Sequence, residues 1–161
     1  MGEGNKKAKV NTPTPSWEMR RRIFEYFKKH GAPCMRDEPL RGEGNNHNYV
    51  TLLTGRKFNI AILLSDSCGL WTYIFSRDPD GNLDRRILAN IDRNNPPAGA
   101  RFVDCSNGPG RGIKTRNVCK LERDIDWRTL RDKDIETLLG DYNWFIEQLR
   151  RNDVLERGVT K

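Results

Sequence analysis

Apolar residues are concentrated between Phe58 and Ser76, where two apolar runs flank a short polar joint. The runs are Phe58–Leu64 and Leu70–Phe75, and residues 65–69 between them read Ser-Asp-Ser-Cys-Gly. Because Ser and Asp side chains bond nearby backbone and Gly accepts positive φ, the joint predicts a turn. Both runs are rich in the branched and aromatic residues that fill a pleated surface. We therefore expect a β-hairpin at the centre of the core.

Three further segments have the short apolar runs or the alternation that is typical of strands. They are Tyr49–Thr54, Arg101–Ser106 and Asn117–Ile125. Gly55 lies in the short link after the first of them, so Tyr49–Thr54 is predicted to form a hairpin with Phe58–Leu64. The three successive strands that end at Ser76 would then form a meander.

Residues 83–91 fit two different structures. The Asp-Gly pair at 80–81 favours a tight antiparallel return, which would make the segment another strand. Leu83, Ile87 and Ile91 stand at i, i+4 and i+8, which fits one face of a helix. The strand is the favoured interpretation and the helix is the alternative.

Two amphipathic helices are predicted, one at each end of the folded region. Ser16 is a suitable N-cap and Gly31 marks a stop, so the first helix occupies the residues between them. Its apolar residues recur at helical spacing and comprise Met19, Ile23, Phe24, Tyr26 and Phe27. The apolar stripe of the last helix comprises Ile135, Leu138, Leu139, Tyr142, Phe145, Ile146 and Leu149.

These elements predict an α+β fold, with an antiparallel sheet of five or six strands packed by an N-terminal and a C-terminal amphipathic helix. The chain has 161 residues, and residues 16–152 are expected to form a single domain. Residues 1–15 are polar and contain three Lys, so we expect a flexible basic arm. Residues 153–161 are expected to fray.

The formal net charge of +7 adds a functional indication. The basic excess lies mainly in the first helix and in residues 81–131, and 19 of the 29 basic residues are Arg. The forked donor set of Arg matches phosphate and carboxylate groups. Such an excess is typical of proteins with an acidic partner, most often nucleic acid, although it also serves solubility alone.

A basic, glycine-rich segment at residues 107–116 is the first candidate binding site. Glycines let backbone N–H groups approach an anion, and three basic side chains add positive charge. The spacing matches neither a Walker A loop nor a dinucleotide fingerprint, and the alternative is a solvated hairpin tip. Together with the first helix, this segment supplies the predicted contacts to a nucleic-acid backbone, which are Arg20, Arg21, Lys28, Arg111, Lys114 and Arg116.

Alternating carboxylates in the sequence LERDID form a second candidate site. On a strand, Glu122, Asp124 and Asp126 would project to one face together with Lys120. Clustered carboxylates bind Mg²⁺ for phosphodiester cleavage, and a neighbouring Lys would stabilise charge. Lys120, Glu122 and Asp124 are therefore the catalytic candidates. The favoured alternative is a solvated edge whose carboxylates balance neighbouring arginines.

Three aromatic residues, Trp71, Tyr73 and Phe75, alternate along one predicted strand. On an open sheet face such a row could stack nucleic-acid bases. The opposite face of the same strand is less apolar and carries Leu70, Thr72, Ile74 and Ser76. Because two covering helices need large apolar residues beneath them, we expect the aromatic face to be the covered one.

No metal or cofactor site is predicted. The four cysteines are widely spaced, without a C-x₂-C pair, and the two histidines are not spaced as partners for them. These residues are Cys34, Cys68, Cys105, Cys119, His30 and His47. The acidic turn at residues 78–84 has the opening of a calcium loop but lacks its Glu at the twelfth position. We expect reduced cysteines and neither zinc nor calcium.

The favoured hypothesis is a small, non-enzymatic basic module that contacts the phosphate backbone of DNA or RNA. The alternatives are a protein-interaction or inhibitory accessory factor of viral or mobile-element type, and a metal-dependent nuclease. No apolar run approaches the ~18 residues of a membrane span. The N-terminal lysines are not followed by the apolar segment of a secretory signal. We therefore expect a cytoplasmic protein without a membrane partner.

Overall fold

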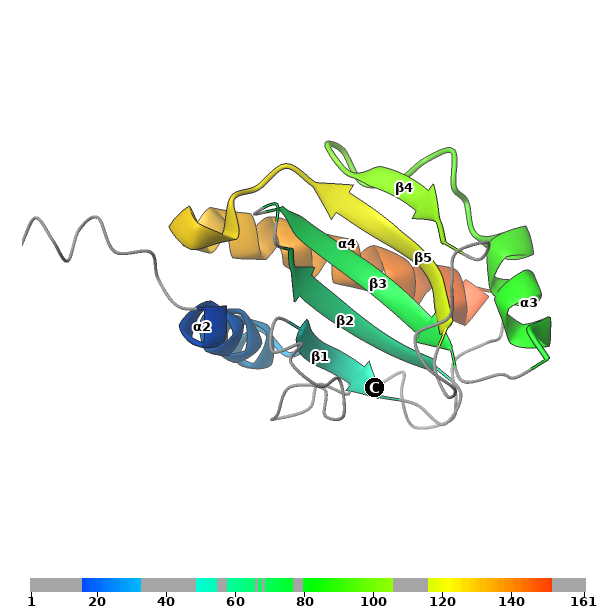
Figure 1. The fold of residues 1–161 in the computed structure, drawn as a ribbon, viewed down its shortest axis with the longest axis horizontal. Helices are drawn as coiled ribbons and strands as arrows, with labels where there is room; N and C mark the ends of the chain where they lie inside the picture. The colour runs from blue at the N-terminus through cyan, green and yellow to red at the C-terminus, as the bar shows by residue number, and fades with distance from the viewer. Residues whose placement is uncertain are drawn as a thin grey trace, which may run out of the picture.

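The computed structural model describes residues 16–32, 49–54, 58–65, 67, 69–76, 80–105 and 116–151. The predicted basic arm at residues 1–15 and the predicted frayed tail at residues 153–161 lie outside this described part. Within it, strands and helices are both present; α4 lies behind the twisted sheet, and α2 and α3 lie towards opposite ends of the molecule (Figure 1).

The sheet has five strands in the order β1-β2-β3-β5-β4, and every neighbouring pair is antiparallel. The predicted α+β class with an antiparallel sheet is therefore confirmed. β3 is the central strand, and Figure 1 shows α4 running along the back of the sheet. The strands are β1 (Tyr49–Thr54), β2 (Phe58–Leu64), β3 (Leu70–Ser76), β4 (Arg101–Asp104) and β5 (Arg116–Arg123).

The predicted central hairpin is formed by β2 and β3. Their register is continuous from the pair Phe58 and Ser76 to the pair Leu64 and Leu70. Ser65 closes the turn, because both its backbone N–H and its hydroxyl donate to the carbonyl of Gly69 at 3.0 Å. A Cβ at position 69 would lie only 3.2 Å from the carbonyl oxygen of Arg123, so glycine allows the turn to approach the neighbouring strand closely.

The predicted strand at residues 83–91 is wrong, because this segment forms helix α3 (Asn82–Asn90). Gly81 precedes it with a left-handed φ of 72° and starts a helix in place of a hairpin return. Leu83, Ile87 and Ile91 are all buried along one side, as the i, i+4, i+8 spacing allowed. β3 pairs with β5 and not with the segment that follows it, so the chain crosses over the edge of the sheet through α3.

The other helices are α2 (Ser16–Lys29) and α4 (Asp132–Arg151), and a short 3₁₀ helix, η1 (Trp127–Thr129), precedes α4. α2 contributes Met19, Ile23 and Phe27 to the main core, with Ile23 and Phe27 completely buried. The rings of Phe27 and Tyr142 pack edge to face, with their centroids 5.6 Å apart. The fully buried apolar residues of α4 comprise Ile135, Leu138, Tyr142 and Phe145.

The aromatic row of β3 faces away from the helices, contrary to the sequence prediction. Leu70 and Ile74 belong to the main core with the helices. Tyr73 and Phe75 belong to a second cluster, which contains strand residues and Cys105 but no described helix residue. The physical reason is volume: α2 and α4 supply large side chains to the helix side of the sheet, so β3 contributes its smaller residues there.

A buried ion pair joins the sheet to α4. Nε and Nη2 of Arg123, at the end of β5, donate to the two carboxylate oxygens of Asp141 at 2.7 and 2.8 Å. The Asp141 side chain is completely buried and that of Arg123 is 8% exposed. Such a pair is costly to break from one side, since the remaining charge would be buried without a partner.

The seating of α2 in the core can be tested with Ile23→Ala. The substitution removes a completely buried side chain, so it should lower the free energy of unfolding by about 2–5 kcal/mol. Lys29→Ala, on the exposed side of the same helix, should change it by less than about 0.5 kcal/mol. Urea unfolding measures both. An Ile23→Ala protein as stable as the Lys29→Ala protein would show that α2 is not part of the cooperative core.

Candidate functional site

The net charge of the described chain comes entirely from the segment that contains α2. Residues 16–32 hold five Lys and Arg against two Glu. Residues 80–105 hold four basic and four acidic residues, and residues 116–151 hold eight of each. The remaining described residues carry no charged side chain. The described surface is therefore electrically balanced except around α2.

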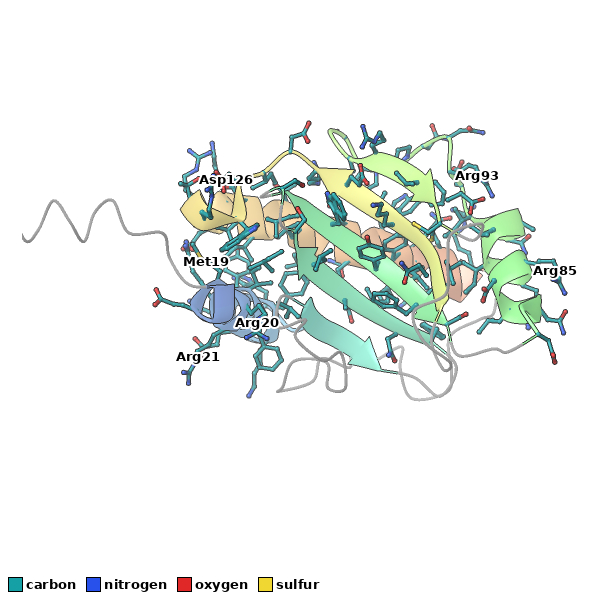
Figure 2. The ribbon with its side chains drawn as sticks, viewed as in Figure 1. Met19, Arg20, Arg21, Arg85, Arg93 and Asp126 are labelled. Atoms are coloured by element: carbon teal, nitrogen blue, oxygen red, sulfur yellow. The ribbon has the colours of Figure 1, made fainter. Side chains whose placement is uncertain are left out.

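The sequence explains why α2 exposes this charge. Its three core residues recur at i, i+4 and i+8, so they occupy one narrow side of the helix. Figure 2 shows Met19 on the side that faces η1 and Arg21 on the outer side. Glu18 in the first turn and Lys28 and Lys29 in the last turn complement the helix dipole.

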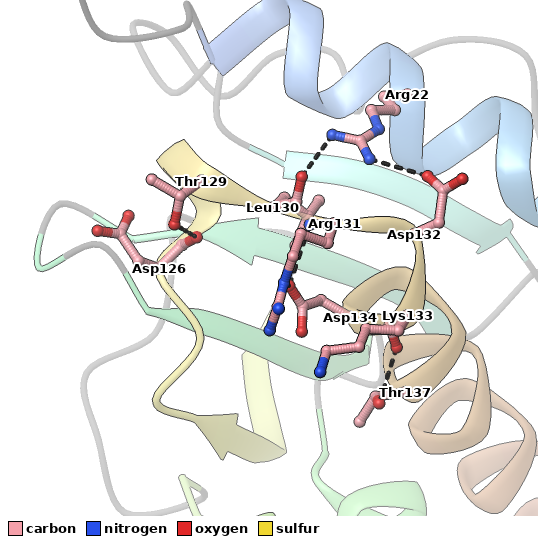
Figure 3. A network of polar contacts seen from close by, with 9 residues as sticks. All are labelled: Arg22, Asp126, Thr129, Leu130, Arg131, Asp132, Lys133, Asp134 and Thr137. Atoms are coloured by element: carbon pink, nitrogen blue, oxygen red, sulfur yellow. Dashed lines mark hydrogen bonds and ion pairs between the residues drawn. The ribbon is translucent and has the colours of Figure 1, made fainter. Parts of the chain in front are cut away.

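Arg22 attaches α2 to the start of α4. Its Nη1 donates to the carbonyl oxygen of Leu130 at 2.5 Å, and its Nη2 donates to Oδ1 of Asp132 at 2.8 Å (Figure 3). The two acceptors lie more than 100 residues away in the chain. Because both ends of its guanidinium are engaged, Arg22 positions the helix and is not a candidate for ligand binding.

Arg20 differs from every other sheltered cation in the described residues. Four described Lys and Arg side chains are partly or wholly buried, and three of them have a carboxylate partner: Arg22 with Asp132, Lys120 with Glu122, and Arg123 with Asp141. In Arg20 the Nε atom is buried without a hydrogen-bond partner. Burial also lowers the pKa of Arg20 from its ordinary value.

The partial burial of Arg20 is not compensated by a carboxylate among the described residues. Desolvating a cation without supplying a counter-charge costs free energy, and folded proteins normally compensate it with a carboxylate. The α2 sequence offers no such compensation, because Glu18 and Glu25 are exposed and Arg21 donates to Glu25 at 3.3 Å. Arg20 is therefore suited to receive an anion from outside the described chain.

The structure brings together half of the predicted nucleic-acid contacts. Arg20, Arg21 and Lys28 lie on α2, where Arg21 and Lys28 are exposed and Arg20 is partly buried. Arg111 and Lys114 lie outside the described residues. Arg116 is the first residue of β5, but its side chain is also outside the described part. The contribution of the glycine-rich segment stays a prediction.

The expected strand over residues 117–125 ends earlier than predicted, because β5 ends at Arg123, so the candidate row of carboxylates does not lie on one strand face. Only Lys120 and Glu122 share a strand face, where their side chains pair at 2.6 Å. Asp124 is exposed beyond the strand, and Asp126 caps η1 by accepting from the backbone N–H of Arg128 at 2.9 Å. The chain leaves the sheet here because Arg123 is held by Asp141 and the following residues turn into η1.

Lys120 and Glu122 form a closed cluster on the sheet face opposite the helices. Lys120 Nζ lies 3.6 Å from the ring centroid of Trp71 and 3.4 Å from the hydroxyl of Tyr73. Glu122 also accepts from Arg101 on the neighbouring strand β4. Each side chain of the Lys120–Glu122 pair is 12% exposed, and each charge is already compensated. This arrangement packs the face but does not offer a free base or metal ligand.

The described residues contain no group of three or more His, Cys, Asp or Glu side chains that could hold a metal ion. Cys105 and Cys119 are free thiols, and burial raises the pKa of both. His30 stacks on Tyr26, with ring centroids 4.2 Å apart. Cys34, Cys68 and His47 lie outside the described part of the chain. The described region therefore gives no support to metal or thiol chemistry.

Comparison with protein-family models, with curated proteins and with solved structures finds no significant match. No helix in the described segments is long and apolar enough to cross a membrane.

The sequence marks Arg20 only as one of several basic residues of the first helix. What distinguishes it is the lack of a carboxylate partner next to a buried Nε, which depends on tertiary packing. The one local signal is position: Arg20 directly follows the core residue Met19, so its stem must pass the edge of the apolar stripe. Arg22 has the same residue type two positions later and an entirely different role.

The pairing of the Glu122 carboxylate with Lys120 and Arg101 predicts that the stability of the protein depends on pH. Burial raises the pKa of Glu122, but the hydrogen bonds from Lys120 and Arg101 outweigh it and leave the pKa below its ordinary value. The resulting stabilisation is present above the unfolded-state pKa of about 4.3 and is lost as the pH falls through the lower folded-state pKa. The free energy of unfolding should therefore fall less steeply below about pH 4.5 in Glu122→Gln than in the wild type.

Urea unfolding between neutral pH and about pH 3 measures this difference. Arg101→Gln, which removes one of the two hydrogen bonds, should give an intermediate slope. Parallel curves for the wild type and Glu122→Gln would contradict the coupling.

Proposed function

We propose that this domain binds the phosphate backbone of a nucleic acid through α2, without catalysing a reaction. The observation that carries the proposal is Arg20, a partly buried cation for which the described chain supplies no counter-charge. Phosphate oxygens accept from the forked donors of arginine and form charge-assisted hydrogen bonds. A backbone phosphate would thus supply the counter-charge for Arg20 that the described chain does not provide.

The neighbouring cations extend this site along the helix. At 100° per residue, Arg20, Lys28 and Arg21 fall within about 100° of the helix surface, and Lys28 lies about 12 Å further along the axis than Arg20. Arg21 is paired with Glu25, but both side chains are more than 60% exposed. Exposed pairs of this kind contribute little, so exchanging Glu25 for a phosphate costs little.

A backbone-binding role also agrees with the balance of charge elsewhere. The described surface outside residues 16–32 has equal numbers of acidic and basic residues, so binding would be directed to one side of the molecule. Arg111, Lys114 and Arg116 stay a separate prediction, because β5 begins at Arg116 opposite Ser76, whose hydroxyl donates to Asp84 on α3, at the other end of the molecule from α2 (Figure 1). The compensated Lys120–Glu122 pair favours a binding module over a nuclease.

The test is the affinity for a fluorescently labelled oligonucleotide, measured by anisotropy over a series of salt concentrations. With three phosphate contacts on a single strand, log K should fall with log salt with a slope of about −2 or steeper. Arg20→Gln should weaken binding about tenfold or more and make the slope shallower by about 0.7. The reason is the loss of one charge-assisted phosphate contact.

Arg85→Gln is the matched control. Arg85 lies on α3, at the opposite end of the molecule from α2, and donates only to Asn82 among the described residues (Figure 2). Its loss should leave affinity within about twofold, because it removes the same charge without a site contact. Absence of binding at low salt, or equal effects of the two substitutions, would overturn the proposal. Binding of an acidic protein, without binding of DNA or RNA, would favour the protein-interaction alternative.

A further inference from the structure

An aromatic ring lies between two cations on the Arg20 side of α2. Arg20, Phe24 and Lys28 stand at i, i+4 and i+8, so they form one line, with about 6 Å of helix rise between successive residues. Phe24 packs against the core with part of its surface and leaves the rest exposed. Along the helix axis, this line therefore presents a cation, an aromatic ring and a second cation.

The side of α2 that carries Tyr26 and Arg22 makes contacts with the start of α4. There Tyr26 stacks on His30, and Arg22 is engaged by Leu130 and Asp132. The bonds from Arg22 place this side against the acidic start of α4, where desolvation and the carboxylates of Glu136 and Asp132 raise the pKa of Tyr26. An anionic ligand is thus directed away from α4 and towards the line of Arg20, Phe24 and Lys28.

The outermost part of α2 is unfavourable for a duplex groove. Glu18 and Glu25 are exposed, and on a helical projection they lie about 140° and 160° from the core residue Ile23. A helix inserted into a groove would present both carboxylates to the phosphates that line it. A strand lying along one side of the helix would contact the cations and avoid these carboxylates.

We infer that α2 selects single-stranded nucleic acid, with an unpaired base stacked on Phe24 and the flanking phosphates bound by Arg20 and Lys28. This inference rests on the proposed function and adds the substrate class to it. Bases in a duplex are stacked on one another and cannot cover a protein ring, whereas unpaired bases stack on aromatic side chains irrespective of sequence. The site would therefore prefer single strands without reading their sequence.

The test compares a 15-nucleotide single strand with the duplex of the same sequence, at one salt concentration and with anisotropy as the readout. The wild type should bind the single strand more tightly. Phe24→Leu keeps an apolar contact to the core but removes the ring, so it should weaken single-strand binding by about five- to 150-fold and leave duplex binding unchanged. Phe24→Tyr retains the ring and should retain the preference.

Phe102→Leu is the control for loss of an aromatic ring elsewhere. Phe102 is partly buried on β4, with the guanidinium of Arg93 5.7 Å from its ring centroid, and its substitution should leave both affinities unchanged. A second probe requires no change in the protein. A single strand with abasic positions keeps its phosphates, so weaker binding by the wild type would confirm the contribution of stacked bases.

The outcomes separate the two proposals. Equal affinity for single strand, duplex and abasic strand, with a normal salt dependence, would overturn the inference and leave backbone binding in place. Weakening of both affinities to the same extent by Phe24→Leu would also overturn it, because the ring would then act only through the fold. The absence of salt-dependent binding to any oligonucleotide would overturn the proposed function and the inference together.

Discussion

The burial of Met19, Ile23 and Phe27 determines how α2 lies against the rest of the protein. These side chains enter the same core as α4 and the helix side of the sheet, and Ile23 and Phe27 are completely buried. Once they are in place, the rotation of α2 is fixed. Arg20 is then carried to the boundary between core and solvent, where its Nε is sheltered without a partner. The candidate site is thus a direct consequence of core packing.

The sheet provides the rigid support for this arrangement. Its helix side holds the main core, and its other side holds the smaller cluster of Ala61, Tyr73 and Phe75. Charged residues on that second side compensate one another through Arg101, Glu122 and Lys120. At the end of β5, Arg123 and Asp141 fix the sheet to α4. Among the described Lys and Arg residues that are at least partly buried, Arg20 on α2 is therefore the one without a carboxylate partner.

Local sequence signals were sufficient for the central hairpin and for the first and last helices. Their apolar residues repeat with one clear period, and turn or capping residues mark their ends. The segment at 83–91 satisfied two periods at once, and the choice depended on whether β3 would pair with it or with β5. That pairing is decided by residues far apart in the chain. The orientation of Trp71, Tyr73 and Phe75 was misjudged for a similar reason, since the volume supplied by the helices is not visible in one strand.

The candidate site shows the same limit. Arg20 and Arg22 are equivalent in sequence terms, yet Arg22 is bound by residues 108 and 110 positions away, whereas the buried Nε of Arg20 has no partner. Basic composition identified the helix, but only the tertiary contacts distinguish a positioning arginine from one that is ready to bind. The pairing of Glu122 with Arg101 likewise cannot be predicted from the sequence, because it depends on the register of β4 against β5.

The most direct measurement of the central claim is the Nε–H resonance of Arg20 in a nitrogen–proton NMR spectrum, assigned by its loss in Arg20→Lys. On titration with a short single-stranded oligonucleotide, we expect this resonance to shift at the same concentrations as the anisotropy change. The Nε–H resonance of Arg123, which is held by Asp141, should stay in place. An Arg20 resonance that does not move while binding saturates would contradict the account.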